Sequence, residues 1–432
     1  MTRSIPAWVV LLSVLAGCTG EAPASIGGIG TYANPIDLDY RYNFEQKNRG
    51  ISYRSGADPV VIEHGGEYFL FATISGGYWR SEDLLHWRFV EPTKWPFEGV
   101  VAPAALSVRD TLYLLQSTTV ARPILFTTAP ETGILEFYNR LLPPPPGAMS
   151  PYDERPRVPD GVPPGPWDPA FFHDPDTDRW YMYWGSSNFY PLYGAELDKG
   201  RQLVWADSPV ALFGLHPERH GWERFGQDHR DTRDPFIEGA WMTKHGGRYY
   251  LQYGAPGTEY NVYANGTYVA DSPLGPFEYA PYNPVSYKPG GWMMGAGHGN
   301  TFQDVHGNWW NTGTGWVGIN WNFERRIVIY PAGFDADGQM YADTRFGDFP
   351  HRIPRGEWED SRDLFTGWML LSYRKPVEPT SVRDTFRASN LTDEDPRTYW
   401  LAARNAAGEG ATIDLGGERT LRAVQVNFVD HA

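Results

Sequence analysis

The chain has 432 residues, a formal net charge of −15, 15% aromatic residues, 47 glycines and 37 prolines. This composition favours a turn-rich β protein with one large domain and one small one, and long helices are not expected. The acidic charge leaves no basic patch for nucleic acid or an anionic membrane, so a neutral, sugar-like ligand suits the chain better.

The N-terminus has the pattern of a bacterial export signal. Arg3 precedes an apolar run at residues 7–15, which is too short to span a bilayer, and Leu15-Ala-Gly-Cys18 resembles a lipobox. We therefore expect a signal peptide over residues 1–18, lipidation of Cys18 and a polar tether over residues 19–30. This interpretation places the protein at the bacterial cell envelope, in contact with the membrane only through its lipid anchor. An ordinary cleaved signal is the alternative.

A strand-turn-strand unit then recurs five times. Each copy has a β-favouring run, a short polar turn and a second run rich in aromatic residues. The copies begin at Asp58, Ala102, Asp168, Glu238 and His298. Their spacing leaves room for four-stranded blades, and the pattern predicts an all-β, five-bladed β-propeller over residues 31–372. Four of the five starting residues can perform proton or metal chemistry, and closure of the ring would turn them toward one axis.

Two further segments interrupt or follow the repeat. A proline-rich insertion at residues 139–167 leads directly to Asp168, and we interpret it as a loop bordering the mouth of the ring, with a solvent-exposed elaboration as the alternative. A linker is predicted at residues 373–380. Residues 381–432 resemble the beginning of a discoidin-type β-sandwich, but they are too few for a complete one.

The acidic starting residues suit hydrolysis of a glycosidic bond. That reaction needs one carboxylic acid to protonate the leaving oxygen and one carboxylate to activate water. Asp58 follows small residues and is assigned the general base, whereas aromatic neighbours disfavour the ionised form of Glu238, which is assigned the general acid. Asp168 would raise the pKa of the acid further. Because Asp58 and Glu238 lie on non-adjacent blades, a water fits between them and inversion of the anomeric centre is expected.

The ordered motifs around these residues resemble those of glycoside hydrolase family 43. They are Ala57-Asp58-Pro59, Trp167-Asp168-Pro169, Glu238-Gly239 and Gly297-His298-Gly299, and the resemblance covers roughly residues 30–345. It implies a five-bladed inverting enzyme with the same three roles on Asp58, Glu238 and Asp168. It also implies arabinofuranosides, xylosides or galactosides as substrates, and a calcium ion or water cluster near His298. Ala240 departs from the family, which commonly has proline after the Glu-Gly pair.

Several assignments stay open between two interpretations. His298 could contact a ligand or be a structural donor, and Arg54 could bind a sugar hydroxyl or form a surface ion pair. Trp167 and Trp241 could stack on sugar or pack between blades. We expect that no cofactor is required, and a structural calcium ion stays an open alternative. We also expect a monomer. The alternative function is a non-catalytic carbohydrate-binding propeller lipoprotein.

Overall fold

The computed structural model describes residues 30–43, 53–93, 101–118, 120–149, 162 and 165–430. Cys18 and the predicted signal peptide lie outside them, as does most of the proline-rich insertion beyond residue 149. The chain divides into two compact units, one containing residues 30–370 with 421–430 and the other residues 371–420. Among the described residues, no helix is long and apolar enough to cross a membrane.

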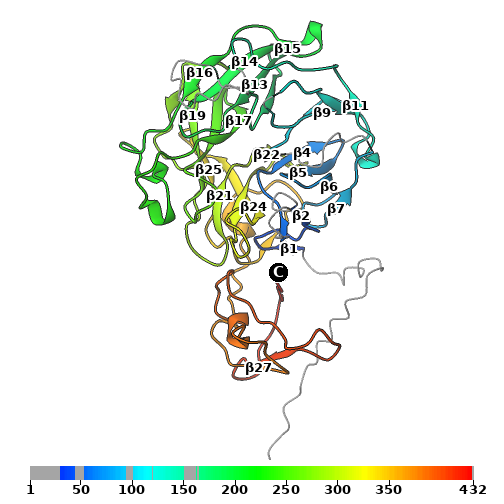
Figure 1. Cartoon of the computed structure of the whole chain (residues 1–432), viewed down its shortest axis with the longest axis vertical. Helices are drawn as coiled ribbons and strands as arrows, with labels where there is room; N and C mark the ends of the chain where they lie inside the picture. Colours follow the sequence, from blue (N-terminus) through cyan, green and yellow to red (C-terminus); the bar gives the residue numbers. More distant parts are fainter. Residues whose placement is uncertain are drawn as a thin grey trace, which may run out of the picture. The chain divides into compact units, whose positions relative to one another are not determined.

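Five antiparallel sheets build the larger unit, and they follow one another around the ring in Figure 1. Blade 1 contains β4 (Val60–His64), β5 (Glu67–Phe71), β6 (Tyr78–Ser81) and β7 (Arg88–Val90). Blade 2 contains β8 (Ala104–Val108), β9 (Thr111–Leu115), β10 (Leu125–Thr127) and β11 (Glu136–Phe137). Blade 3 contains β12 (Ala170–Asp174), β13 (Arg179–Trp184), β14 (Leu192–Asp198), β15 (Val204–Trp205) and β16 (Val210–Phe213). Blade 4 contains β17 (Glu238–His245), β18 (Arg248–Ala255), β19 (Ala264–Ala270) and β20 (Glu278–Tyr279). Blade 5 contains β21 (Met294–Gly297), β22 (Thr301–Gln303), β23 (Trp309–Trp316), β24 (Arg325–Phe334) and β25 (Met340–Ala342).

The innermost strands close into a ring. Each innermost strand contacts the next: β4 contacts β8, β8 contacts β12, β12 contacts β17, β17 contacts β22, and β22 contacts β4 again. At the closure the Asn300 side chain imitates a strand, because its Oδ1 accepts from the Val61 amide at 2.9 Å and its Nδ2 donates to the Val61 carbonyl at 2.7 Å. The predicted five-bladed propeller is therefore confirmed.

Large aromatic side chains fill the spaces between neighbouring blades. Trp79 and Trp310 lie in the apolar layer between blades 1 and 5, and Trp180 and Trp184 lie in the layer between blades 2 and 3. All four are at most 2% exposed. Burial of such rings is the main apolar contribution that holds the blades together, which explains the high aromatic content of the sequence.

The segment before blade 1 ties the ring to blade 5. Asn34 exchanges two hydrogen bonds with the backbone of Ile329, and the Ile36 amide donates to the Ile327 carbonyl at 3.0 Å. Short strands complete the unit: β1 (Thr31–Tyr32) pairs with β26 (His351–Arg352), and β2 (Arg41–Asn43) pairs with β3 (Tyr53–Ser55). The 3₁₀ helices are η2 (Pro130–Thr132), η3 (Lys199–Arg201), η4 (Gly221–Glu223), η5 (Gln227–His229) and η6 (Ser361–Leu364).

The smaller unit has little regular structure. It contains β27 (Val377–Pro379), which pairs with β28 (Ala411–Ile413), and the 3₁₀ helix η7 (Ala388–Leu391). Within the predicted linker at residues 373–380, Val377–Pro379 pairs with Ala411–Ile413, more than 30 positions later in the chain, and local sequence cannot reveal such pairing. The discoidin-like assignment stays a prediction.

Candidate active site

The blades enter the centre of the ring through one repeated backbone conformation. Asp58, Ala102, Asp168 and His298 all have positive φ, at 51°, 39°, 46° and 43°. Few residues other than glycine adopt this region, and such strain concentrates at functional sites. The four residues are also buried, with at most 8% of each exposed. The shared conformation explains why the sequence repeat places them in one alignment.

Blade 4 differs from the other blades by one residue. Gly239, with φ of 66°, takes the left-handed position, so Glu238 stands one place earlier than the alignment of the repeats suggested. The pairing of β17 with β18 shifts between Glu238 and Trp241 to accommodate this bulge. A Cβ on Gly239 would lie 2.7 Å from His298 Cγ. Glycine is therefore required both for the turn and for the approach of the histidine.

A set of hydroxyl groups holds these residues in place. The amide of Asp58 donates to Thr314 Oγ1 at 2.8 Å, that of Ala102 to Thr73 Oγ1 at 2.8 Å and that of Asp168 to Ser117 Oγ at 2.9 Å. In each case the hydroxyl comes from the preceding blade around the ring. Through these contacts, the short Ser and Thr side chains fix the position of each starting residue relative to the neighbouring blade.

Asp58 lies in a cationic environment. Its Oδ2 accepts a hydrogen bond from Thr73 at 2.5 Å, and its Oδ1 lies 3.4 Å from Arg325 Nη1 and 3.3 Å from His298 Nδ1. Burial alone would raise the pKa of Asp58, but the charges of Arg325 and His298, with the Thr73 bond, hold that pKa below its usual value. Asp58 is therefore ionised at neutral pH, as a base must be.

Asp168 and Glu238 form a contrasting pair. Burial raises the pKa of Asp168 to about 7, helped by the charge of Asp58 and opposed by hydrogen bonds with serines and Glu238. Burial also raises the pKa of Glu238 to about 7, opposed by His298 and helped by the charges of Asp168 and Asp58. Two adjacent carboxyl groups in a dry site share protons as one unit, so the pair retains a proton near neutral pH.

Two hydroxyl groups donate hydrogen bonds to Glu238. Tyr263 donates a short hydrogen bond of 2.5 Å to Oε1, and Ser186 donates to Oε2 at 3.4 Å. Tyr263 is completely buried, in a slot that depends on two glycines: a Cβ on Gly254 would lie 2.9 Å from its hydroxyl, and a Cβ on Gly297 would lie 2.7 Å from its ring. The acid therefore has one oxygen fixed by a tyrosine from its own blade.

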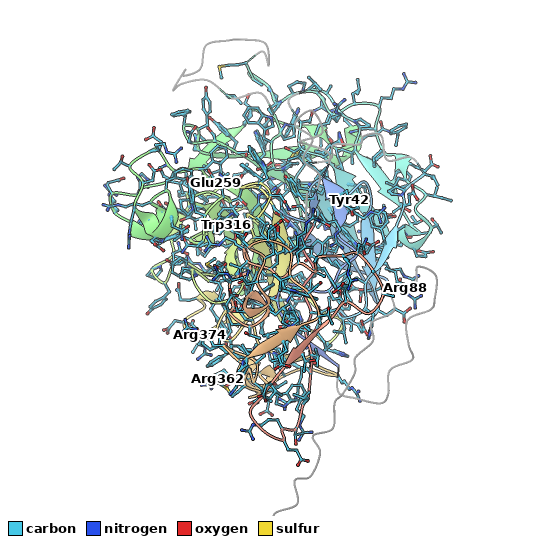
Figure 2. The ribbon with its side chains drawn as sticks, turned by 60° about the horizontal axis from the view of Figure 1, so that its bottom comes forward. Tyr42, Arg88, Glu259, Trp316, Arg362 and Arg374 are labelled. Carbon is cyan, nitrogen blue, oxygen red and sulfur yellow. The ribbon has the colours of Figure 1, made fainter. Side chains whose placement is uncertain are left out.

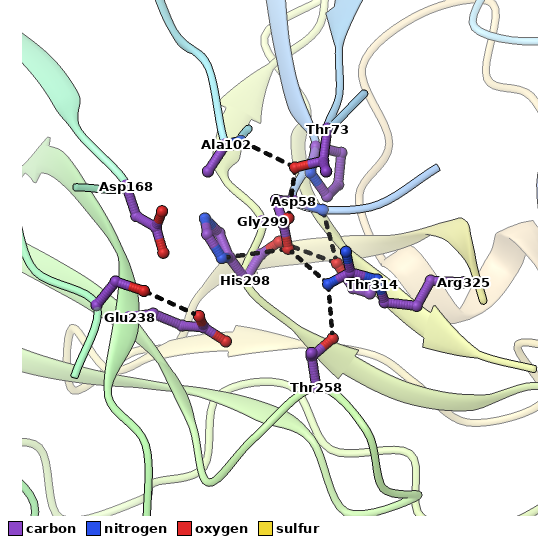
Figure 3. Close-up of polar contacts among 12 residues, drawn as sticks. Asp58, Thr73, Ala102, Asp168, Glu238, Thr258, His298, Gly299, Thr314 and Arg325 are labelled. Carbon is purple, nitrogen blue, oxygen red and sulfur yellow. Dashed lines mark hydrogen bonds and ion pairs between the residues drawn. The ribbon is translucent and has the colours of Figure 1, made fainter. Parts of the chain in front are cut away.

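His298 lies between the two groups of carboxylates. Figure 3 shows its ring with Asp58 on one side and Asp168 and Glu238 on the other. Donor atoms of Asp168, Glu238 and His298 lie within 4.8 Å of one another, so these three could hold a metal ion. Calcium takes six to eight oxygen ligands, whereas this set offers two carboxylates and one nitrogen. The residues therefore fit calcium poorly, and we derive no step through a metal.

The residues predicted to bind sugar have different environments in the structure. Arg54 forms an ion pair with Asp430, with Nε 3.0 Å from Oδ1, so the ion-pair interpretation applies. Trp241 is 7% exposed, packs in the apolar layer with Ala105 and Ala170 and donates to the Thr301 carbonyl at 2.9 Å. Its environment is that of a packing residue. Trp167 is half-buried directly before Asp168, and its contact with substrate stays a prediction.

The residues that support the site were not predicted from the sequence. They are Thr73, Ser117, Ser186, Tyr263, Thr314 and Arg325. Three of them carry a signal in the repeat, because a Ser or Thr stands two residues beyond the second strand of blades 1, 2 and 3. Arg325 lies far from the site in sequence, and no local pattern marks it.

Comparisons with known proteins agree with this fold. Residues 151–340 match the model of the family described as Glycosyl hydrolases family 43. A comparison with curated protein sequences gave no match.

Several solved structures share the fold. A mutant family-43 protein from Bacillus licheniformis is 18% identical with a TM-score of 0.53, over 77% of this chain and 61% of that one. A thermostable family-43 glycoside hydrolase is 21% identical with a TM-score of 0.56, over 76% of this chain and 100% of that one. A xylan β-1,4-xylosidase from Bacillus halodurans is 18% identical with a TM-score of 0.53, over 76% and 60%. The chain thus spans about three fifths of the length of two of these proteins. The family match covers residues 151–340, less than half of the chain, and the solved structures show that the propeller fold is shared.

Proposed function

We propose that the chain is an inverting glycosidase that releases terminal arabinofuranosyl, xylosyl or galactosyl units from the side chains of polysaccharides or oligosaccharides. One observation carries the proposal: two carboxyl groups on opposite sides of His298 have opposite electrostatic environments (Figure 3). Asp58 is held ionised, and Glu238 is held partly protonated. Pairs of acids whose pKa values are pushed apart divide into base and acid in this way.

The proposed mechanism follows from these protonation states. Asp58 removes a proton from a water molecule, which attacks the anomeric carbon while Glu238 gives its proton to the departing glycosidic oxygen. Asp168 does not touch the reacting atoms in this scheme. Its charge raises the pKa of Glu238 and keeps the proton available. His298 separates Asp58 from Glu238, which favours an intervening water and therefore inversion over direct attack by the carboxylate.

The substrate proposal rests on one structural neighbour and on the resemblance of the motifs. One of the structural neighbours is a xylan β-1,4-xylosidase, so a xyloside is the first candidate. Arabinofuranosides and galactosides follow from the resemblance of the motifs. Sugar choice depends on the loops around the mouth of the ring, which vary more than the blades.

The alternative, a carbohydrate-binding propeller without turnover, has less support. Binding alone would not need a buried acid with a raised pKa beside a buried base with a lowered one, since each such group costs stability. A panel of nitrophenyl arabinofuranosides, xylosides and galactosides separates the two functions. We expect cleavage of at least one by the wild type and at least a hundredfold lower kcat for Glu238→Gln on a substrate with a poor leaving group. Complete inactivity on the panel and on natural oligosaccharides would support the binding protein.

We also propose that the protein is attached to the bacterial cell envelope by a lipid on Cys18. The lipobox-like Leu15-Ala-Gly-Cys18 supports this. Membrane fractionation of the wild type and of Cys18→Ser tests it, because the variant should move to the soluble fraction. An unchanged membrane fraction would contradict lipidation.

A further inference from the structure

The turn between β18 and β19 is tied directly to the proposed base. Thr258 Oγ1 accepts a hydrogen bond from Arg325 Nη1 at 3.1 Å, and the same nitrogen lies 3.4 Å from Asp58 Oδ1. Figure 3 shows this chain from Thr258 through Arg325 to Asp58. The turn therefore belongs to the wall of the site, and the residue that follows Thr258 is Glu259.

Glu259 is a partly buried carboxylate beside aromatic groups. A Cβ on Gly257 would contact both the Phe225 ring and Glu259 Oε2, the latter at 3.1 Å, so the carboxylate folds back along its own turn toward Phe225. Phe225 packs edge-on against Tyr260, with 5.1 Å between the ring centroids. Glu259 is labelled in Figure 2.

The cations near Glu259 are engaged elsewhere. Arg233 pairs with Asp231 at 2.6 Å and donates to the Tyr260 hydroxyl at 3.1 Å, whereas Arg325 serves Asp58 and Thr258. Burial raises the pKa of Glu259, and the charges of Arg233 and Arg325 oppose this without a hydrogen bond from either. Over the described part of the chain, no other side chain donates a hydrogen bond to Glu259, which has only its own backbone amide.

A partly buried carboxylate with unused acceptor positions is costly unless a ligand supplies donors. Sugar hydroxyls are such donors, and the wall of the site is where they would arrive. We propose that Glu259 binds hydroxyl groups of the sugar unit held at the catalytic carboxylates and so sets substrate specificity. The proposal rests on the proposed glycosidase function and deepens it.

The charge of Glu259 also restricts the class of sugar. Glu259 adds a carboxylate to the wall of the site, so a sugar that carries its own carboxylate next to Glu259 would meet like charge. A neutral sugar with a free hydroxyl facing the β18–β19 turn fits this arrangement. We therefore expect terminal uronic acids to be poor substrates, and Glu259→Gln should improve their hydrolysis.

Kinetics on matched substrates test the proposal. For the best neutral glycoside, Glu259→Ala should lower kcat/KM about 10- to 100-fold, the usual effect of losing a hydrogen bond to a charged group. On the monodeoxy analogue that lacks the bound hydroxyl, wild type and variant should agree within about twofold. Glu278→Ala, on the outer strand of the same blade and exposed, is the control and should leave kcat/KM unchanged.

Two results would overturn the proposal. One is retention of the wild-type kcat/KM by Glu259→Ala, and the other is an equal loss on every deoxy analogue, which would show a structural effect. Calorimetric titration with free xylose, arabinose and galactose separates this test from the proposed function. If the wild type binds a sugar without hydrolysing any glycoside and Glu259→Ala loses that binding, the Glu259 proposal holds and the hydrolase proposal fails. If no sugar binds to the wild type, the Glu259 proposal fails.

Discussion

Replacing Tyr263 with phenylalanine should move the pH dependence of the reaction in a counterintuitive direction. The hydroxyl donates a hydrogen bond of 2.5 Å to Glu238 Oε1 and lowers the pKa of that carboxyl, against burial that raises it to about 7. A hydrogen bond to a charged group contributes about 1.5 to 3 kcal/mol, which corresponds to roughly one to two pKa units. In Tyr263→Phe the pKa of Glu238 should therefore rise further above its usual value.

The pH profile of kcat/KM measures this shift. The basic limb reports loss of the proton from the acid, so it should move up by about one unit or more, and the variant should keep more of its maximal activity above pH 8 than the wild type. A glycoside with a poor leaving group is needed, because its departure depends on the acid. A basic limb that stays within 0.2 units would refute the role of Tyr263 and weaken the assignment of Glu238 as the acid.

A matched control exists in the same blade. Tyr253 donates to Glu223 Oε1 at 2.6 Å, and both side chains are buried. Tyr253→Phe removes the same kind of hydrogen bond from a glutamate to which we assign no catalytic role. It should lower stability without moving the basic limb, which separates an effect on the acid from a general loss of packing.

Three further predictions concern the same carboxyl groups and the core. Asp168→Asn removes a charge that raises the pKa of Glu238, so the basic limb should move down, and an upward shift would contradict the proposed role of Asp168. The folded-state pKa values of Asp168 and Glu238 are raised above their unfolded values. Their contribution to the free energy of unfolding is therefore complete below about pH 4 and is lost as the pH rises through about 7. Glu238→Gln should therefore have a higher melting temperature than the wild type at pH 8 but not at pH 4, and equal differences at both would refute this. Trp241→Phe leaves the Thr301 carbonyl without its hydrogen-bond donor. The variant should therefore have a free energy of unfolding in urea that is lower by about 1 to 3 kcal/mol, and an unchanged KM. A tenfold rise in KM would instead indicate that the Trp241 ring contacts the sugar.

Periodicity made the propeller predictable. Strand pairs with polar turns recur along the sequence, and ring closure follows because each blade must bury two apolar faces. The placement of Asp58, Asp168 and His298 was predictable for the same reason, since the repeat carries one backbone conformation to each of them. The repeat also identified Glu238, but it aligned this residue one place too late with respect to the other blades. Only the structure reveals the bulge at Gly239 that causes the offset.

The supporting residues were harder to predict. Arg325 reaches Asp58 from more than 260 positions later in the chain, and Tyr263 reaches Glu238 from the turn directly before the third strand of its blade. Such contacts depend on tertiary packing, which local pattern does not encode. For Trp241 the sequence left two interpretations open, and the side chain lies in the core, because alternate residues of a strand face opposite sides.

The anomeric configuration of the first product tests the central claim most directly. Proton NMR during the first minutes of hydrolysis, before mutarotation, distinguishes the two anomers of the released sugar. Activation of a water by Asp58 with protonation by Glu238 predicts a product of inverted configuration. A product that retains the configuration of the substrate would require a covalent intermediate and would contradict the roles proposed for these two residues.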